Sequence, residues 1–202
     1  MRRLVTGRLL PGPLAKPVPL SIGPQDPRLE DHQTNVQLQA MNPSAPLLMI
    51  DVDGVISLFG FEQTEPPEGR FVVVEGIPHL ISARAGERLA RLAEAFECVW
   101  CTGWEDRAEE HLPRLLGLAG GWAHLTFAVE AGEGLHWKLE AIEAHAGAER
   151  PVAWIDDAHD ASCERWAAER PGATLLVATD PRVGLTDEHV ATLLQWARAA
   201  SA

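Results

Sequence analysis

The chain has 202 residues, of which 46% are hydrophobic and 23% charged, a composition typical of a globular protein. Acidic residues outnumber basic ones by 29 to 17, and the formal net charge of -12 disfavours non-specific binding to nucleic acid or to an anionic membrane. No apolar run approaches the length of a membrane-spanning helix, about 20 residues. The N-terminal stretch also lacks the apolar segment of a signal peptide. The three cysteines fit a reducing compartment. We therefore expect a cytoplasmic protein with no membrane partner and no disulfide-linked partner, and the oligomeric state stays open.

The first part of the chain differs in composition from the rest. Residues 1–45 are rich in proline and show neither a helical nor a strand periodicity, which predicts a disordered leader. Met41 lies shortly before the first apolar run, so a translation start at Met41 is an alternative. From residue 46 onward, short apolar runs alternate with amphipathic stretches. The sequence therefore predicts one α/β domain over residues 46–202, built on a parallel sheet with helical crossovers.

The expected elements follow in chain order. A buried strand over residues 47–50 comes first, and residues 57–82 contain a small β-hairpin with arms at 71–74 and 79–81. Helices are expected over 83–96, 105–116, 135–146, 158–169 and 186–200, and further strands over 98–101, 152–155 and 174–178. Because the hairpin is the one segment available to cover a site, we expect no large cap domain.

Polar residues follow three of these predicted strands. They are Asp51 and Asp53, Thr102 and Gly103, and Asp156 and Asp157. In open parallel sheets, ligands bind in the crevice beyond the carboxyl ends of the strands, so these side chains are expected to converge. Lys138 precedes the last of the three strands and is the one lysine of the predicted domain. Its rarity favours a place in the same site.

This set of residue types suits phosphoryl transfer. Two carboxylates at Asp51 and Asp53 can act differently, one attacking and one transferring protons, because Asp53 lies on a turn that Gly54 makes possible. Four aspartates in one crevice would repel each other and require a cation, and oxygen ligands without His or Cys indicate Mg²⁺. Thr102 can donate a hydrogen bond to an oxyanion, and Lys138 supplies a positive charge. Together they can form and hydrolyse an aspartyl-phosphate.

The order of these motifs resembles a known superfamily. Asp51-Val-Asp53-Gly54-Val55, Thr102-Gly103, Lys138 and Asp156-Asp157 resemble the four motifs of the haloacid dehalogenase (HAD) phosphatases and phosphotransferases. Val99-Trp-Cys-Thr102-Gly-Trp104 and Trp154-Ile-Asp156-Asp157 are similar, more narrowly, to the HAD domain of Swiss-army-knife RNA repair proteins. The resemblance covers about residues 47–196. It implies a HAD-like Rossmannoid fold, with a parallel sheet, helices on both faces and the hairpin as a flap.

The resemblance also implies a role for each residue. Asp51 would be the nucleophile, and Asp53 the general acid and then the base. Thr102 and Lys138 would hold the phosphoryl group, while Mg²⁺ would be held by Asp51, the Asp53 carbonyl and Asp156, with Asp157 assisting directly or through water. Gly103 and Trp104 are candidate substrate-binding residues; Trp104 could stack on a base or sugar, or simply pack against its neighbours.

The leading functional hypothesis is a Mg²⁺-dependent phosphomonoester hydrolase. Its substrate could be a small phosphorylated molecule, a nucleotide or a nucleic-acid end, and a polyanion would need nearby arginines such as Arg70, Arg84 and Arg107. A phospho-acceptor signalling domain uses similar residues, but there the acidic pair comes first and the phosphorylated aspartate later. A catalytically idle interaction module is the other alternative, although grouped carboxylates would then cost stability through repulsion.

Overall fold

The computed structural model describes residues 45–127 and 134–201. Apart from Ala45, the expected leader and the alternative start at Met41 lie outside the described residues. The strands are β1 (Leu47–Ile50), β2 (Ser57–Leu58), β3 (Gly69–Val74), β4 (Ile77–Ser82), β5 (Glu97–Trp100), β6 (Ala123–His124), β7 (Val152–Asp156) and β8 (Thr174–Ala178). The helices are α2 (Ala85–Ala93), α3 (Asp106–Leu116), α4 (Leu139–Ala146), α5 (Ala161–Glu169) and α6 (Asp187–Ala200).

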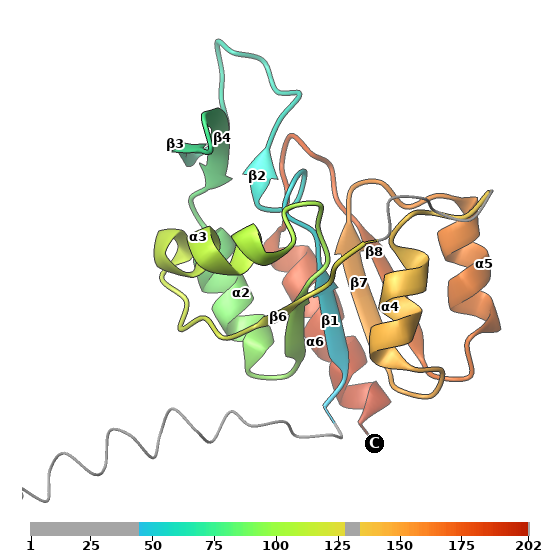
Figure 1. The fold of residues 1–202 in the computed structure, drawn as a ribbon. Helices are drawn as coiled ribbons and strands as arrows, with labels where there is room; N and C mark the ends of the chain where they lie inside the picture. Colours follow the sequence, from blue (N-terminus) through green and yellow to red (C-terminus); the bar gives the residue numbers. More distant parts are fainter. Residues whose placement is uncertain (1–44, 128–133, 202) are drawn as a thin grey trace, which may run out of the picture. The chain divides into compact units, whose positions relative to one another are not determined.

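The central sheet is parallel and has the strand order β6-β5-β1-β7-β8 (Figure 1). β1 lies in the middle, where Ile50 is level with Trp100 of β5 and with Ile155 of β7. All four β1 side chains are fully buried, as expected of a strand covered on both faces. The carboxyl ends of β5, β1 and β7 therefore lie side by side, which brings the residues that follow these strands together.

Helices cover both faces of this sheet, as predicted. Alternate strand residues point to opposite faces, and the two hydrophobic cores follow this alternation. One core joins Leu48 and Ile50 to apolar residues of α2, α3 and α6. The other joins Leu47 and Met49 to apolar residues of α4 and α5. This doubly covered parallel sheet is the Rossmannoid α/β architecture that the sequence predicted.

The predicted hairpin is present and forms part of a second sheet. β3 and β4 are antiparallel arms joined at Glu75 and Gly76, which both have positive φ, 50° and 83°, the geometry of a tight hairpin turn. β2 pairs with the other edge of β4. Figure 1 shows this small sheet beyond the carboxyl end of β1. Among the described residues, the segment between β1 and α2 holds this sheet and its loops and no larger cap.

Among the differences from the sequence prediction are two helix starts and two short strands, β2 and β6. α4 begins at Leu139 rather than 135, because residues before it form a turn in which the Lys138 N–H donates to Nδ1 of His136. α5 begins at Ala161 rather than 158, because Asp160 caps it by accepting hydrogen bonds from the N–H groups of Ser162 and Cys163. β6 was not predicted, since it has only two residues and both are exposed.

The cysteines lie in the two cores and form no disulfide among the described residues. Cys98 belongs to the core with α2 and α6, whereas Cys101 and Cys163 belong to the core with α4 and α5. Burial raises the pKa of Cys98 to about 12 and also raises the pKa of Cys101. Throughout the described residues, no helix is long and apolar enough to cross a membrane.

Candidate active site

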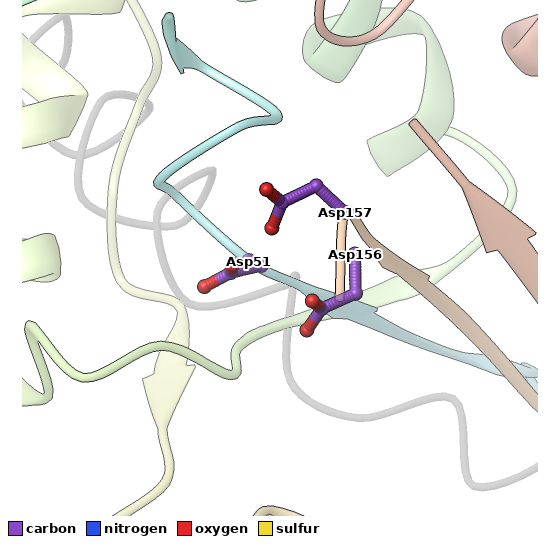
Figure 2. Close-up of side chains that lie close together, drawn as sticks. All are labelled: Asp51, Asp156 and Asp157. Carbon is purple, nitrogen blue, oxygen red and sulfur yellow. The ribbon is translucent and has the colours of Figure 1, made fainter. Parts of the chain in front are cut away.

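Three of the four predicted aspartates bring their carboxylates together. Asp51 directly follows β1, Asp156 ends β7, and Asp157 is the next residue (Figure 2). The two strand ends are joined by a hydrogen bond from the Asp51 N–H to the Ile155 carbonyl oxygen, 3.1 Å long. One carboxylate oxygen from each aspartate lies within 4.8 Å of the other two. The adjacency of β1 and β7 thus creates the acidic cluster.

Lys138 lies against this cluster and is almost fully buried. Its Nζ is 2.9 Å from Oδ1 of Asp51 and 2.7 Å from Oδ2 of Asp156. Burial alone would lower the pKa of Lys138, but the carboxylates of Asp51 and Asp156 outweigh it, so the pKa is raised. Asp156 also accepts hydrogen bonds from the Trp154 indole N–H and the Ala158 N–H. The ammonium group therefore stays charged and fixed between two strand ends.

The cluster carries more negative than positive charge. Burial raises the pKa of Asp51 to about 6; Lys138 opposes this shift and Asp156 adds to it. The pKa of Asp157 is also raised, first by burial and then by the nearby Asp156. One ammonium group cannot neutralise three carboxylates, and the ligands on offer are all oxygen atoms. This donor set fits a hard divalent cation such as Mg²⁺.

Gly54 leaves room for the third carboxylate. A Cβ atom on Gly54 would lie 2.4 Å from Cγ of Asp157 and 2.5 Å from its Oδ2, and the φ of Gly54 is +75°. The turn is held from both sides: the Gly54 N–H donates to the Ser57 carbonyl at 2.8 Å, and the Thr179 hydroxyl donates to the Gly54 carbonyl at 2.9 Å. Both the backbone shape and the contact with Asp157 therefore require glycine.

Asp53 faces a different set of neighbours. Its side chain is half exposed, and its Oδ2 accepts a hydrogen bond from the Trp104 indole N–H at 2.9 Å. Its Oδ1 is 3.8 Å from Nδ1 of His79, which lies on β4 of the small sheet. The two carboxylates of the Asp51-Val-Asp53 motif thus have separate surroundings, one buried beside Lys138 and one at the edge of the crevice.

Thr102 and Gly103 come after β5, and Asp51 comes after the neighbouring strand β1. The Cys101 N–H donates to the Ile50 carbonyl at 2.8 Å, which fixes the two strand ends side by side. Thr102 is 1% exposed, and its Oγ1 accepts a hydrogen bond from the Trp104 N–H at 3.4 Å. Because the oxygen acts as the acceptor there, the hydroxyl hydrogen can be donated to another group.

Several residues of this region were not expected from the sequence. Besides His79, Trp137 lies close to two of the predicted site residues. Its ring centroid is 5.0 Å from Nζ of Lys138, and a Cβ on Gly103 would lie 3.8 Å from the ring. The position of Trp137 directly before Lys138 was the available signal. The sequence gives no comparable signal for His79, because its contact with Asp53 depends on how the small sheet folds back toward the strand ends.

The three arginines considered for a polyanion all have partners within the protein. Arg70 donates to the Leu115 carbonyl, Arg84 pairs with Asp187, and Arg107 pairs with Glu75. A cavity of about 720 Å³ is lined by Trp137 and by α4 and α5 residues such as Leu139 and Trp166. None of the predicted site residues lines it. The acidic cluster at the strand ends therefore lies outside this cavity.

A comparison with known protein families identifies the family of this chain. The model for the "HAD domain in Swiss Army Knife RNA repair proteins" matches residues 47–190. The crystal structure of a hypothetical protein from Xanthomonas campestris is similar, with 14% sequence identity and a TM-score of 0.41, over 78% of this chain and 85% of that one. No curated protein matches the sequence. Because the family match spans well over half of the residues, the chain belongs to the HAD domains of Swiss Army Knife RNA repair proteins, which indicates a phosphatase-type hydrolase whose acidic cluster can bind a metal.

Proposed function

We propose that the protein is a Mg²⁺-dependent phosphomonoester hydrolase that acts through an aspartyl-phosphate at Asp51. The observation that carries this proposal is the convergence of Asp51, Asp156 and Asp157, with Lys138 paired to the first two and a further carboxylate, Asp53, two residues after Asp51. Family membership supports it. A structural ion pair would need one carboxylate for Lys138, whereas this site gathers three.

Asp51 and Asp156 would hold the cation, together with the main-chain carbonyl of Asp53, and Asp157 would assist directly or through water. When bound, the cation would neutralise charge on the phosphoryl oxygens and on the cluster. The oxygen-only donor set and the surplus of negative charge support this assignment.

In the first step, a carboxylate oxygen of Asp51 attacks the phosphorus atom. The bond between phosphorus and the leaving oxygen breaks as the new bond to Asp51 forms. Asp53, as the carboxylic acid, donates its proton to the leaving oxygen, so the alcohol departs neutral and Asp53 becomes a carboxylate. The half-exposed position of Asp53 supports this role, because the leaving group must depart toward solvent.

In the second step, the Asp53 carboxylate takes a proton from a water molecule. The water oxygen attacks phosphorus, the bond to Asp51 breaks, and inorganic phosphate leaves. Asp53 is then protonated again and Asp51 is again a carboxylate, so the cycle closes without a further reactant.

The remaining site residues would hold the phosphoryl group. Thr102 would donate its hydroxyl hydrogen to a phosphoryl oxygen, and Lys138 would offset the charge that develops on it. Gly103 would let the substrate approach the backbone closely, since it carries no side chain. Trp104 is buried and donates a hydrogen bond to Asp53, which favours a role in packing and in orienting Asp53 over stacking on a substrate.

For the substrate, we propose a nucleotide or a phosphorylated nucleic-acid end. The small sheet of residues 57–82 is short for enclosing a small metabolite, so binding energy would come from parts of the substrate outside the crevice. The description of the family, which names RNA repair proteins, points the same way. Comparing kcat/KM for sugar phosphates, mononucleotides and end-phosphorylated oligonucleotides tests this; a clear preference for a sugar phosphate contradicts it.

The direct test of the activity is hydrolysis of p-nitrophenyl phosphate with Mg²⁺ and with EDTA. We expect turnover that requires the metal and is lost in Asp51→Asn, while Glu164→Gln, an exposed carboxylate on α5, keeps it. A phospho-acceptor domain would retain one phosphoryl group and stop. An idle module would show neither reaction, and that result would refute the proposal.

A further inference from the structure

The Asp53 side chain needs an external support to act in catalysis. Its carboxylate is half exposed, and an exposed aspartate samples several rotamers. Proton transfer requires the acid to lie within hydrogen-bond distance of the leaving oxygen. Among the described side chains, Trp104 donates a hydrogen bond to this carboxylate, from Nε1 to Oδ2 at 2.9 Å.

Trp104 is itself held firmly. It is 8% exposed, its N–H donates to the Thr102 hydroxyl oxygen, and its carbonyl accepts from the N–H and from Nε of Arg107, both at 3.1 Å. The ring also meets the His79 ring edge to face, with centroids 4.6 Å apart and an angle of 62° between the planes. The indole donor therefore has a fixed position relative to Thr102.

The small sheet supports the same arrangement from the other side. Nδ1 of His79 lies 3.0 Å from the Ser57 hydroxyl and 3.8 Å from Oδ1 of Asp53. Ser57 also forms an isolated β-bridge with Asp53. Ser57 therefore connects the backbone of Asp53 to His79, whose ring packs on Trp104. The Asp53 carboxylate is thus placed between the turn after β5 and strand β4.

We propose that Trp104 is a positioning residue that holds Asp53 for proton transfer to the leaving group. An indole N–H can only donate, so on the protonated acid it bonds to the oxygen that does not carry the proton. Because this bond occupies Oδ2, Oδ1 is the oxygen that carries the transferred proton. The inference rests on the proposed function and adds to it the residue that orients the acid and the oxygen that acts.

The test uses Trp104→Phe, which keeps an aromatic ring and removes the N–H. Trp166→Phe is the matched control, because the Trp166 Nε1–H also donates to a carboxylate, Oε2 of Glu143 at 3.1 Å, away from the site. We expect Trp104→Phe to lower kcat for an alkyl phosphate by about 2- to 10-fold, the range that corresponds to loss of one hydrogen bond between uncharged groups. For p-nitrophenyl phosphate, whose leaving group needs little protonation, the loss should be much smaller. KM and the affinity for Mg²⁺ should be unchanged, and the control should match the wild type.

An equal loss of kcat for both esters, or no loss for the alkyl ester, would overturn the proposal. A second measurement covers the case in which Trp104→Phe does not fold: the ¹⁵N–¹H signal of the Trp104 indole should shift upfield in Asp53→Ala while the Trp166 signal stays in place. An unmoved Trp104 signal would also overturn the proposal. If the wild type hydrolyses no ester, the proposed function fails, and the indole signal still reports separately whether the contact exists.

Discussion

Gly54→Ala should damage the metal site more than its small size suggests. The added methyl carbon would lie 2.4 Å from Cγ of Asp157, closer than two carbon atoms can approach, and it would sit on a backbone with φ of +75°. The turn cannot easily move away, because hydrogen bonds from the Gly54 N–H and from the Thr179 hydroxyl hold it. The Asp157 carboxylate must therefore leave its place in the cluster.

Gly54→Ala should have two separate effects, one on stability and one on metal affinity. A left-handed backbone conformation costs an L-residue about 1–2 kcal/mol, which lowers the Tm of a domain of this size by about 2–8 °C. Displacing a group that supports a metal ligand costs about 10- to 100-fold in metal affinity. Gly54→Ala should show both the loss of Tm and the loss of Mg²⁺ affinity.

Gly76→Ala is the matched control for the backbone effect. Gly76 has φ of +83°, and nothing lies within 4 Å of the Cβ that it would gain. This variant should lose a similar amount of stability without losing metal affinity. Thermal unfolding and calorimetric titration with Mg²⁺ of both variants measure the two effects. If the two variants bind Mg²⁺ equally well, Asp157 does not contribute to the site and our reasoning about it is wrong.

Three further predictions concern the acid, the helix contacts and the start of the chain. Asp53→Asn should lower kcat for alkyl phosphates by about 10²- to 10⁴-fold and much less for aryl phosphates; equal losses in a leaving-group series would exclude the acid role. Asp187→Asn should lower the urea midpoint at pH 7, because hydrogen bonds from Arg88 and the charges of Arg88, Arg84 and Arg91 lower the pKa of Asp187. Because the pKa of Asp187 is lowered in the folded state, its ionised form stabilises the fold at pH values above the unfolded pKa of about 3.9, and this stabilisation is lost as the pH falls through the folded pKa. The wild type and Asp187→Asn should therefore differ in urea midpoint at pH 7 and converge at the lowest pH. A difference that stays constant with pH would refute this. Removing residues 1–40 should change the Tm by no more than about 2 °C, and a larger drop would show that the domain needs them.

The positions of the strands and of the motif residues could be predicted because local sequence determines them. β1 and β8 have the predicted bounds, since continuous apolar runs that end at a polar residue define a buried strand. Asp51, Thr102 and Asp156 each follow or end such a strand, so the topology of a parallel sheet was enough to predict that they converge. Lys138 could be singled out by its rarity.

Other features depend on contacts that the local sequence does not determine. The starts of α4 and α5 are set by single side-chain hydrogen bonds, from Lys138 N–H to His136 and from the N–H groups after Asp160 to its carboxylate. The contact of His79 with Asp53 requires the small sheet to fold back over the strand ends. The bond between Trp104 and Asp53 depends on a side-chain orientation, and sequence alone could equally place that ring in a core or on a substrate.

The central claim is that phosphoryl transfer passes through Asp51. The most direct measurement is mass spectrometry of protein that is quenched with acid shortly after mixing with an aryl phosphate and Mg²⁺, and then digested. We predict one added phosphoryl group on the peptide that contains Asp51, present in the wild type and absent from Asp51→Asn. Hydrolysis of the ester by the wild type with the phosphoryl group on another residue, or undiminished turnover by Asp51→Asn, would contradict the claim.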